Sequence, residues 1–104
     1  GACGQVRGAH ELVAGVGPSH YGHQANPNHA PICGRYLVVE GSRGSVRVQI
    51  SDKCDGCGPN DLLISPKAFE AISEIHLGVA NIKWHFEDSS SEHHHQQQQT
   101  GLAH

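Results

Sequence analysis

Four cysteines, at positions 3, 33, 54 and 57, are the feature that most limits how this chain of 104 residues can fold. A domain of this size buries only about two-thirds of the surface of its unfolded chain, so covalent cross-links would stabilise it appreciably. An even number of cysteines in a short chain is typical of secreted proteins and predicts two disulfides. A four-cysteine zinc site and a redox pair formed by Cys54 and Cys57 are the alternatives, and the residues alone leave the pairing open.

Charge and hydropathy exclude several kinds of partner. The formal net charge is -3 at pH 7 and the chain has no Lys/Arg cluster, so we expect no nucleic acid to bind. No apolar run approaches the roughly 20 residues of a transmembrane helix, so we expect no membrane partner. The ten histidines would turn the net charge positive if they were protonated near pH 6, which would change how the protein adheres to anionic surfaces.

Short strands separated by turns dominate the middle of the chain. They are predicted at residues 12–16, 36–40, 45–51, 62–64 and 79–86. In the third of these, three apolar residues (Val46, Val48 and Ile50) alternate with polar ones, so one face is buried and the other faces outward. The outward face would end with Ser51. The pattern predicts a small β-rich barrel or sandwich with one helix.

The helix is predicted to begin at Pro66, because Ser65 is typical of an N-cap and proline of the first helical position. Its apolar stripe would be formed by three residues: Phe69, Ile72 and Ile75. Gly78 follows closely and would end the helix.

The composition changes at Ser89. Residues 89–104 hold few apolar side chains and a His/Gln repeat, so we predict a folded domain at 1–88 and a disordered tail at 89–104. The three consecutive histidines at 93–95 could bind a metal ion weakly, but a solvated tail is the simpler interpretation. The stretch 17–32 is predicted to be a long loop, which in a compact domain is usually functional or tied down.

Three blocks of sequence, in order, carry a resemblance to a known family. The first is GACG at 1–4, and the second is CGR at 33–35 followed by two strands that end in SDKC at 51–54. The third is LISPKAFEAI at 63–72, with the ending GVANIKW at 78–84. The ordered set resembles the double-psi β-barrel domain of expansins and their relatives, which include fungal loosenins, barwin-like proteins and rare lipoprotein A. The GACG opening and the DKCDGC loop look more fungal than plant.

The resemblance implies a mainly β fold, a six-stranded double-psi β-barrel with one or two short helices and a shallow open groove. It also implies two disulfides, Cys3–Cys33 and Cys54–Cys57. The first would close a loop of about 30 residues, which the chain-entropy model values at roughly 3–4 kcal/mol.

Asp52 is the main candidate for chemistry. The resemblance places it on the groove floor, at the position of the aspartate that expansins need for wall loosening, where it could hydrogen-bond a sugar hydroxyl or act as a general acid. An aspartate that caps the following loop is the alternative. Glycoside hydrolysis needs a second carboxylate at about 5 Å or 6.5–9.5 Å. The sequence offers three partners: Glu11, Asp55 and Asp61.

The chain also departs from the family pattern. Its nearest match to the His-Phe-Asp element of expansins is His20-Tyr21-Gly22, which lacks the aspartate, and the groove tyrosine of a microbial relative falls near Gln49. His20 and Tyr21 could donate hydrogen bonds and stack on a sugar at the groove rim, or they could be ordinary loop anchors.

Three further residues, Arg47, Gln49 and Asp55, are candidate ligand contacts. Trp84 is also a possible sugar platform, but its alternation with Ile82 and Phe86 predicts that it lies in the core. The aromatic-faced second domain of expansins is absent from this sequence.

These observations predict a secreted, extracellular protein that binds cell-wall polysaccharide without cleaving it. A polar groove around Asp52 would compete for the hydrogen bonds between glycan chains. A protein-binding module of the same fold is the alternative, inhibiting a cysteine protease or contacting a host or microbial protein through the loop at 17–32. A lytic glycosidase or transglycosylase ranks last. We expect a monomer with no cofactor and no metal.

Overall fold

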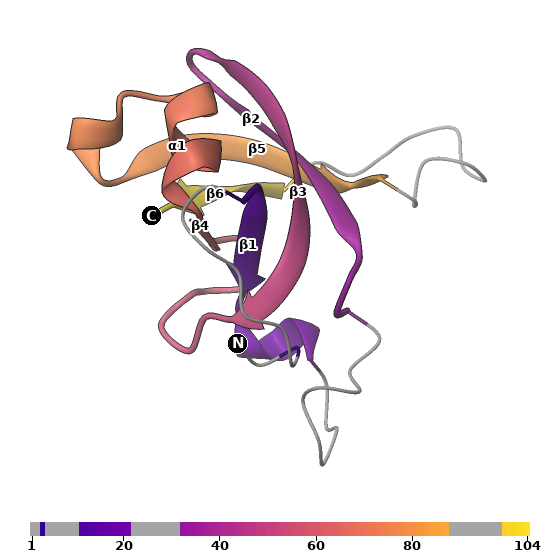
Figure 1. Ribbon diagram of the computed structural model, residues 1–104. Helices are drawn as coiled ribbons and strands as arrows, with labels where there is room; N and C mark the ends of the chain where they lie inside the picture. Colours follow the sequence, from indigo (N-terminus) through magenta and orange to yellow (C-terminus); the bar gives the residue numbers. More distant parts are fainter. Residues whose placement is uncertain (1–2, 4–10, 22–31, 88–98) are drawn as a thin grey trace.

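The computed structural model describes residues 3, 11–21, 32–87 and 99–104. They form a closed barrel of six strands in the order β1-β3-β2-β5-β6-β4 (Figure 1). The strands are β1 (Val13–Val16), β2 (Tyr36–Gly41), β3 (Gly44–Lys53), β4 (Leu62–Ile64), β5 (Ala80–Phe86) and β6 (Gln99–Ala103). The predicted mainly β, six-stranded barrel is therefore confirmed. Within the described residues, no helix has both the length and the apolar character needed to cross a membrane.

Two strand pairs are parallel, β1 with β3 and β4 with β6, and the other pairs are antiparallel. The register of β1 against β3 shifts in the middle: Ala14 faces Ile50, whereas Gly15 faces Asp52. Ser51 is therefore an extra residue on β3. Such a bulge redirects the side chains that follow it. The alternation predicted that Ser51 faces outward, and this was wrong, because Ser51 at the bulge is only 6% exposed.

The barrel interior is filled by apolar side chains from all six strands and the helix. Trp84 is fully buried there, as its alternation predicted, together with Leu37, Val48 and Ile50. The indole Nε1 donates a hydrogen bond of 2.8 Å to the carbonyl oxygen of Asn60, which satisfies the one polar atom of this large ring.

The helix α1 (Pro66–Ile72) covers one end of the barrel beside the tip of the β2–β3 hairpin (Figure 1). Phe69 and Ile72 are buried, but the predicted extension of the stripe to Ile75 was wrong. The helix ends at Ile72, and Ile75 opens a separate 3-10 turn, η3 (Ile75–Leu77), where it is 49% exposed. Gly78, with φ 72°, closes that turn and not α1.

Ser65 occupies the N-cap position of α1, as predicted, but its side chain does not cap the helix. Its hydroxyl donates to the carbonyl oxygen of Glu11 (2.5 Å) and accepts from the backbone N–H of Val13 (3.3 Å). The helix N-terminus is thus tied to the start of β1 by a long-range contact.

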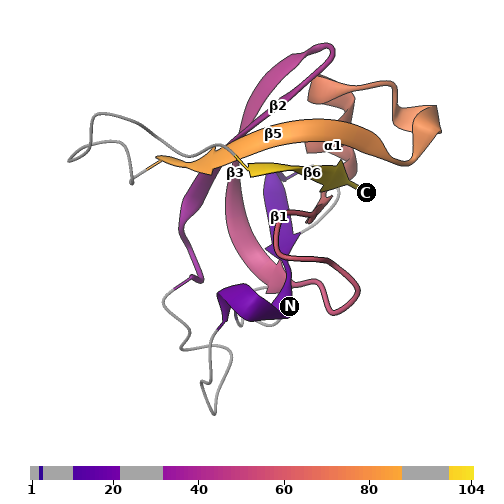
Figure 2. The ribbon, with the colours of Figure 1, turned by 180° about the vertical axis from the view of Figure 1, so that it is seen from behind.

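The structure differs from the prediction at the C-terminus. Residues 99–103, expected to belong to a disordered tail, form β6, which lies beside β5 (Figure 2) and closes the barrel between β5 and β4. Gly101 makes this possible, because a Cβ atom there would collide with the carbonyl oxygen of Asn60. Residues 88–98, including the three consecutive histidines at 93–95, lie outside the described residues.

Candidate binding site

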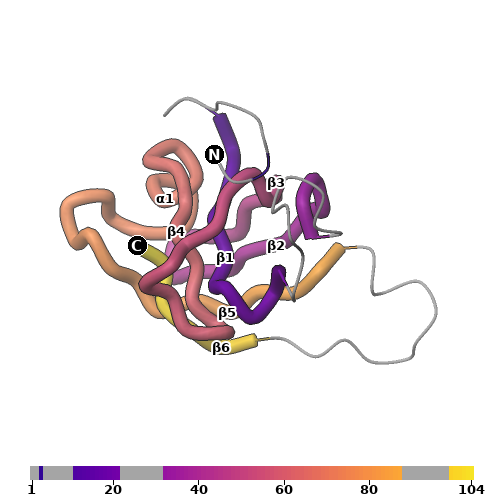
Figure 3. Tube along the Cα trace, turned by 90° about the horizontal axis from the view of Figure 1, so that it is seen from below, coloured from indigo at the N-terminus to yellow at the C-terminus, as the bar shows by residue number. Residues whose placement is uncertain are grey.

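The end of the barrel away from α1 is formed by η1 (Pro18–His20), Tyr21 and the loop 54–61 (Figures 1 and 3). We call this end the mouth. The loop is joined to β1 by a hydrogen bond of 2.7 Å from the Cys54 N–H to the Val16 carbonyl oxygen. Gly17 lets the two segments approach, since a Cβ there would lie 2.8 Å from the carbonyl oxygens of Cys57 and Gly58.

Both disulfides have the pairing that the resemblance implied. Cys3 is bonded to Cys33 and Cys54 to Cys57, with Cα atoms 5.5 and 5.3 Å apart. In this bonded state none of the four cysteines is a thiolate that could bind zinc. Two disulfides fit an oxidising, extracellular location.

The mouth brings Asp52 and Tyr21 together. Tyr21 is only 5% exposed, which favours the buried anchor over stacking on a sugar, the two interpretations that the sequence left open. Burial of the phenol, together with the nearby negative charge of Asp52, raises the pKa of Tyr21 to about 12. The hydroxyl therefore stays protonated at ordinary pH, and it donates a hydrogen bond of 3.5 Å to Cys3 Sγ.

Asp52 has features of both roles considered from the sequence, the loop-capping aspartate and the groove residue. Its Oδ1 accepts a hydrogen bond of 2.8 Å from the backbone N–H of Lys53, as an aspartate that caps a loop would do. It is also half-buried at the strand end, against Gly15, at the position that the resemblance assigned to the groove floor. The local hydrogen bond orients the carboxylate without burying it.

His20 lies at the mouth with its ring turned toward the core. Its Nε2 donates to the carbonyl oxygen of Pro59 at 2.6 Å, and its ring meets Trp84 and Phe86 edge-on at centroid distances of 5.8 and 6.2 Å. The imidazole thus joins η1 to the loop 54–61. Any contact that it makes with a ligand would come from the part of the ring that remains exposed.

Arg47 and Gln49 lie on the outward face of β3 and not at the mouth. Arg47 donates two hydrogen bonds to the carboxylate of Glu87, at 2.6 and 2.9 Å, and its guanidinium covers the Tyr36 ring at 3.6 Å. Gln49 donates to the Gly34 carbonyl oxygen at 3.2 Å. At about 3.3 Å per residue along a strand, Arg47 stands roughly 16 Å from Asp52.

The three proposed carboxylate partners of Asp52 are placed differently. Asp61 accepts hydrogen bonds from the backbone N–H groups of Gly58 (3.3 Å) and Leu102 (2.9 Å), so it joins the loop to β6. The Asp55 side chain is 85% exposed and pairs with Lys53 Nζ at 3.6 Å. Glu11 precedes β1, beside the N-terminus of α1. Among the described residues, no cluster of three or more His, Cys, Asp or Glu side chains could hold a metal ion.

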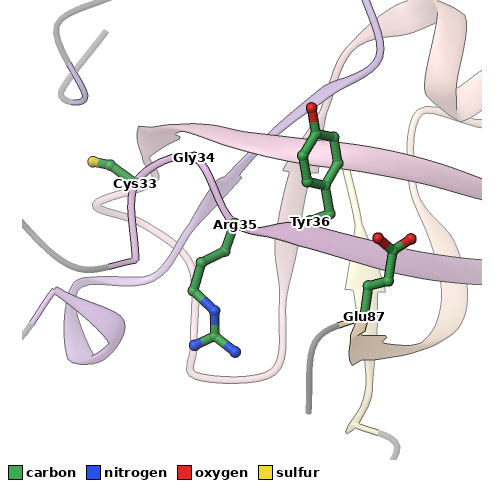
Figure 4. Close-up of a pocket in the computed structure, with 5 residues that line it drawn as sticks. All are labelled: Cys33, Gly34, Arg35, Tyr36 and Glu87. Atoms are coloured by element: carbon green, nitrogen blue, oxygen red, sulfur yellow. The ribbon is translucent and has the colours of Figure 1, made fainter. Parts of the chain in front are cut away.

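A shallow pocket of about 310 Å³ adjoins the mouth and is lined by Cys33, Gly34, Arg35, Tyr36 and Glu87 (Figure 4). Arg35 and Tyr36 point to opposite sides of their strand, and Glu87 stands beside Tyr36. The guanidinium of Arg35 lies 3.9 Å from the centroid of the Phe86 ring. The sequence had not predicted this pocket. The alternation of β2 against β5 held a signal for it, because it places Tyr36 opposite Glu87 on the outward face.

None of the five aromatic rings in the chain offers two open faces to a sugar. Trp84, Tyr21 and Phe69 are buried. The remaining two, Tyr36 and Phe86, are each covered on one face by an arginine. Polar and charged groups therefore dominate what the mouth and the pocket present to a ligand.

Comparison with known proteins relates this architecture to two kinds of binding protein. No protein-family model matches the chain. A papain inhibitor from Streptomyces mobaraensis is 32% identical over 88 residues, which are 83% of this chain and 62% of that protein. The solved Streptomyces papain inhibitor has a TM-score of 0.75 at 28% identity, covering 83% of this chain and 80% of the other.

An expansin from Clavibacter michiganensis, solved as a variant in complex with cellohexaose, has a TM-score of 0.70 at 31% identity, covering 83% of this chain and 40% of its own. The chain therefore shares the double-psi β-barrel fold of the expansin and the papain inhibitor. It spans less than two thirds of the papain inhibitor sequence and of that expansin. The comparisons give no support to the fungal origin that the motifs suggested.

Proposed function

We propose that this protein is secreted and binds cell-wall polysaccharide at the mouth without cleaving it, with Asp52 as the central hydrogen-bond acceptor. The observation that carries the proposal is the position of Asp52, half-buried at the strand end next to the phenol of Tyr21, which stays protonated at ordinary pH. A carboxylate on an open surface can accept hydrogen bonds from sugar hydroxyls, and such charge-assisted bonds are about twice as strong as neutral ones.

The surroundings of Asp52 favour a fixed acceptor. The β3 bulge sets its backbone, the Lys53 N–H orients its carboxylate, and the Cys54–Cys57 disulfide restrains the loop that follows. A pre-oriented acceptor loses little conformational entropy when a glycan binds, so it can compete with hydrogen bonds between glycan chains. His20 and Asp55, at the edges of the mouth, would add contacts.

Binding without hydrolysis is favoured because three carboxylates of the described residues, Asp61, Glu87 and Asp55, are already engaged in other contacts. Hydrolysis needs a second carboxyl group whose protonation changes during the reaction. Asp61 is occupied by two backbone N–H groups, and Glu87 by the two hydrogen bonds from Arg47. Asp55 is an exposed carboxylate that pairs with Lys53.

The test is a pull-down on insoluble cellulose, chitin and peptidoglycan, combined with an assay for reducing sugars. We expect wild-type protein to bind at least one of these and to release no sugar. Asp52→Asn keeps the shape of the side chain and should bind more weakly. The matched control is Glu70→Gln on the exposed side of α1, which removes one negative charge far from the mouth. Sugar release that disappears in Asp52→Asn would contradict non-hydrolytic binding.

Inhibition of a papain-type cysteine protease is the second candidate function. It is favoured by the similarity to the papain inhibitor, which extends over 83% of this chain and 80% of the solved inhibitor. The loop 54–57 also suits it, since the disulfide fixes an exposed turn that contains Asp55 and Gly56. Inhibition that survives Asp52→Asn while no glycan binds would select this function. The predicted contact through the loop at 17–32 concerns residues that lie largely outside the described part of the chain.

A further inference from the structure

The Cys54–Cys57 disulfide differs from the Cys3–Cys33 disulfide in its surroundings. Cys3 and Cys33 pack against the hydrophobic core, and Cys3 Sγ also lies 3.5 Å from the hydroxyl of the buried Tyr21. Cys54 and Cys57 are half-buried, but they belong neither to the core nor to the residues that pack against it. A reductant that approaches the folded protein is therefore less restricted at the second disulfide than at the first, which the core covers on one side.

The turn between Cys54 and Cys57 leaves an open approach to their bond. Asp55 and Gly56 are both exposed, and the Asp55 side chain keeps 85% of its surface accessible to solvent. A Cβ atom at Gly56 would have no other atom within 4 Å. Thiol–disulfide exchange requires a thiolate to approach a sulfur directly, so exposed disulfides are the ones that have labile or regulatory roles.

The loop 54–61 has contacts on both sides of this disulfide that do not depend on it. Before the turn, the Cys54 N–H donates to the Val16 carbonyl oxygen at 2.7 Å. After the turn, the Trp84 indole donates to the Asn60 carbonyl oxygen at 2.8 Å. The bonded cysteines are only 3 positions apart, so their cross-link restricts the unfolded chain less than a long-range one does. Reduction should therefore free the turn while the barrel stays folded.

We propose that Cys54–Cys57 is a redox switch at the mouth, opened by a dithiol reductant and closed again by exchange with a disulfide oxidant. A thiolate of the reductant attacks one of the two sulfurs, so the S–S bond breaks and a mixed disulfide forms. The second thiolate of the reductant then displaces the cysteine, and the reductant leaves as a disulfide. Together Cys54 and Cys57 gain two electrons and two protons and become thiols.

The open state changes the mouth because the turn directly follows Asp52 and Lys53. In the closed state Lys53 Nζ pairs with Asp55 at 3.6 Å, and the Lys53 N–H orients the Asp52 carboxylate. Once the ring is opened, the turn has more conformations, and a glycan that contacts it must order it on binding. This effect on binding rests on the proposed function, whereas the reducibility of the bond does not.

The first experiment treats folded wild type with dithiothreitol at about pH 8, where part of the reagent is thiolate. Iodoacetamide traps the free thiols at successive times, and mass spectrometry identifies the labelled cysteines. We expect Cys54 and Cys57 to be labelled about tenfold faster than Cys3 and Cys33, because exchange depends on access. The circular dichroism spectrum should stay that of the folded protein while only Cys54 and Cys57 carry label. Equal labelling rates for the two pairs, or labelling of Cys54 and Cys57 only when the barrel unfolds, would overturn the proposal.

The second experiment compares oxidised and selectively reduced protein on whichever of insoluble cellulose, chitin and peptidoglycan wild type binds. The reduced protein should bind about fivefold more weakly, the effect of ordering one or two side chains on binding, and should recover after treatment with oxidised glutathione. The matched control is Cys54→Ser/Cys57→Ser, which should bind like reduced wild type with or without reductant. Unchanged binding after selective reduction would overturn the switch. Absence of glycan binding by oxidised wild type would count against the proposed function alone, because labelling decides the reducible site by itself.

Discussion

Asp52 shows how one residue acquires a functional environment from parts of the chain that are distant in sequence. Gly15 faces it across the β1–β3 pair, where a Cβ at position 15 would lie in ordinary van der Waals contact with Asp52, 3.5 Å from its carbonyl oxygen. Tyr21 approaches from η1, and the Lys53 N–H orients its Oδ1. The sequence predicted the importance of Asp52 through the family resemblance alone, because none of these neighbours is visible in its local sequence.

The Tyr21 phenol gives a prediction about stability at high pH. Its pKa is 10.0 in the unfolded chain and about 12 in the folded protein, so the unfolded chain loses the proton first as the pH rises. The free energy of unfolding should therefore keep its full value below pH 10 and fall by roughly 2 kcal/mol as the pH rises toward 12.

Denaturant titrations between pH 8 and 12 measure this effect. Tyr21→Phe should lose the part of the pH dependence that the phenol causes, whereas Tyr36→Phe, which changes the second tyrosine of the chain, should keep it. If the free energy of unfolding fell equally with pH in wild type and in Tyr21→Phe, the proposed burial of the phenol would be contradicted.

Prediction at the residue scale succeeded where the signal was local or came with the family pattern. Alternation placed Trp84 in the core, and the resemblance paired the four cysteines. The sequence did not predict the pairing of Arg47 with Glu87. These residues are 40 positions apart and meet because β2 lies between β3 and β5. The burial of Tyr21 depended in the same way on tertiary contacts.

At the scale of elements, β6 is the strand that the sequence did not reveal. Gln, Thr and Gly open it, and they follow a run of polar residues, so neither apolar alternation nor β-propensity marks it. Its place is set by partners elsewhere: Asp61 accepts from the Leu102 N–H, and Gly101 packs against the Asn60 carbonyl. A strand defined by its neighbours in this way cannot be read from its own composition.

Gly101→Ala tests the role of β6. A methyl group at this position would collide with the Asn60 backbone, so the strand or the loop would have to move. We expect the free energy of unfolding to fall by about 2–3 kcal/mol, the cost of overpacking a close contact. The matched control is Gly56→Ala, because a Cβ at Gly56 would have no atom within 4 Å. Equal stability of the two variants in denaturant titrations would contradict the placement of β6 in the barrel.

At the scale of the whole molecule, the closed barrel and two disulfides restrain the segments around the mouth. Cys3–Cys33 spans a sequence separation of 30 residues, and Cys54–Cys57 spans 3. In the chain-entropy model the longer loop contributes about 4 kcal/mol and the shorter about 2 kcal/mol. We expect Cys3→Ser/Cys33→Ser to lower the free energy of unfolding more than Cys54→Ser/Cys57→Ser does.

Thermal and denaturant unfolding of the two double variants measure this difference. The second variant should lose a larger share of its ligand binding than of its stability, because its disulfide restrains the loop that follows Asp52. A larger loss of stability in Cys54→Ser/Cys57→Ser would show that local strain and not loop closure decides the order.

The central claim is that Asp52 binds glycan as a hydrogen-bond acceptor. The direct measurement is the binding isotherm of wild type, Asp52→Asn and Glu70→Gln on the insoluble glycan that wild type prefers, with circular dichroism to confirm that all three are folded. We expect Asp52→Asn to bind about tenfold more weakly, through the loss of one charge-assisted hydrogen bond, and Glu70→Gln to bind like wild type. Wild-type affinity in a folded Asp52→Asn would contradict the central claim.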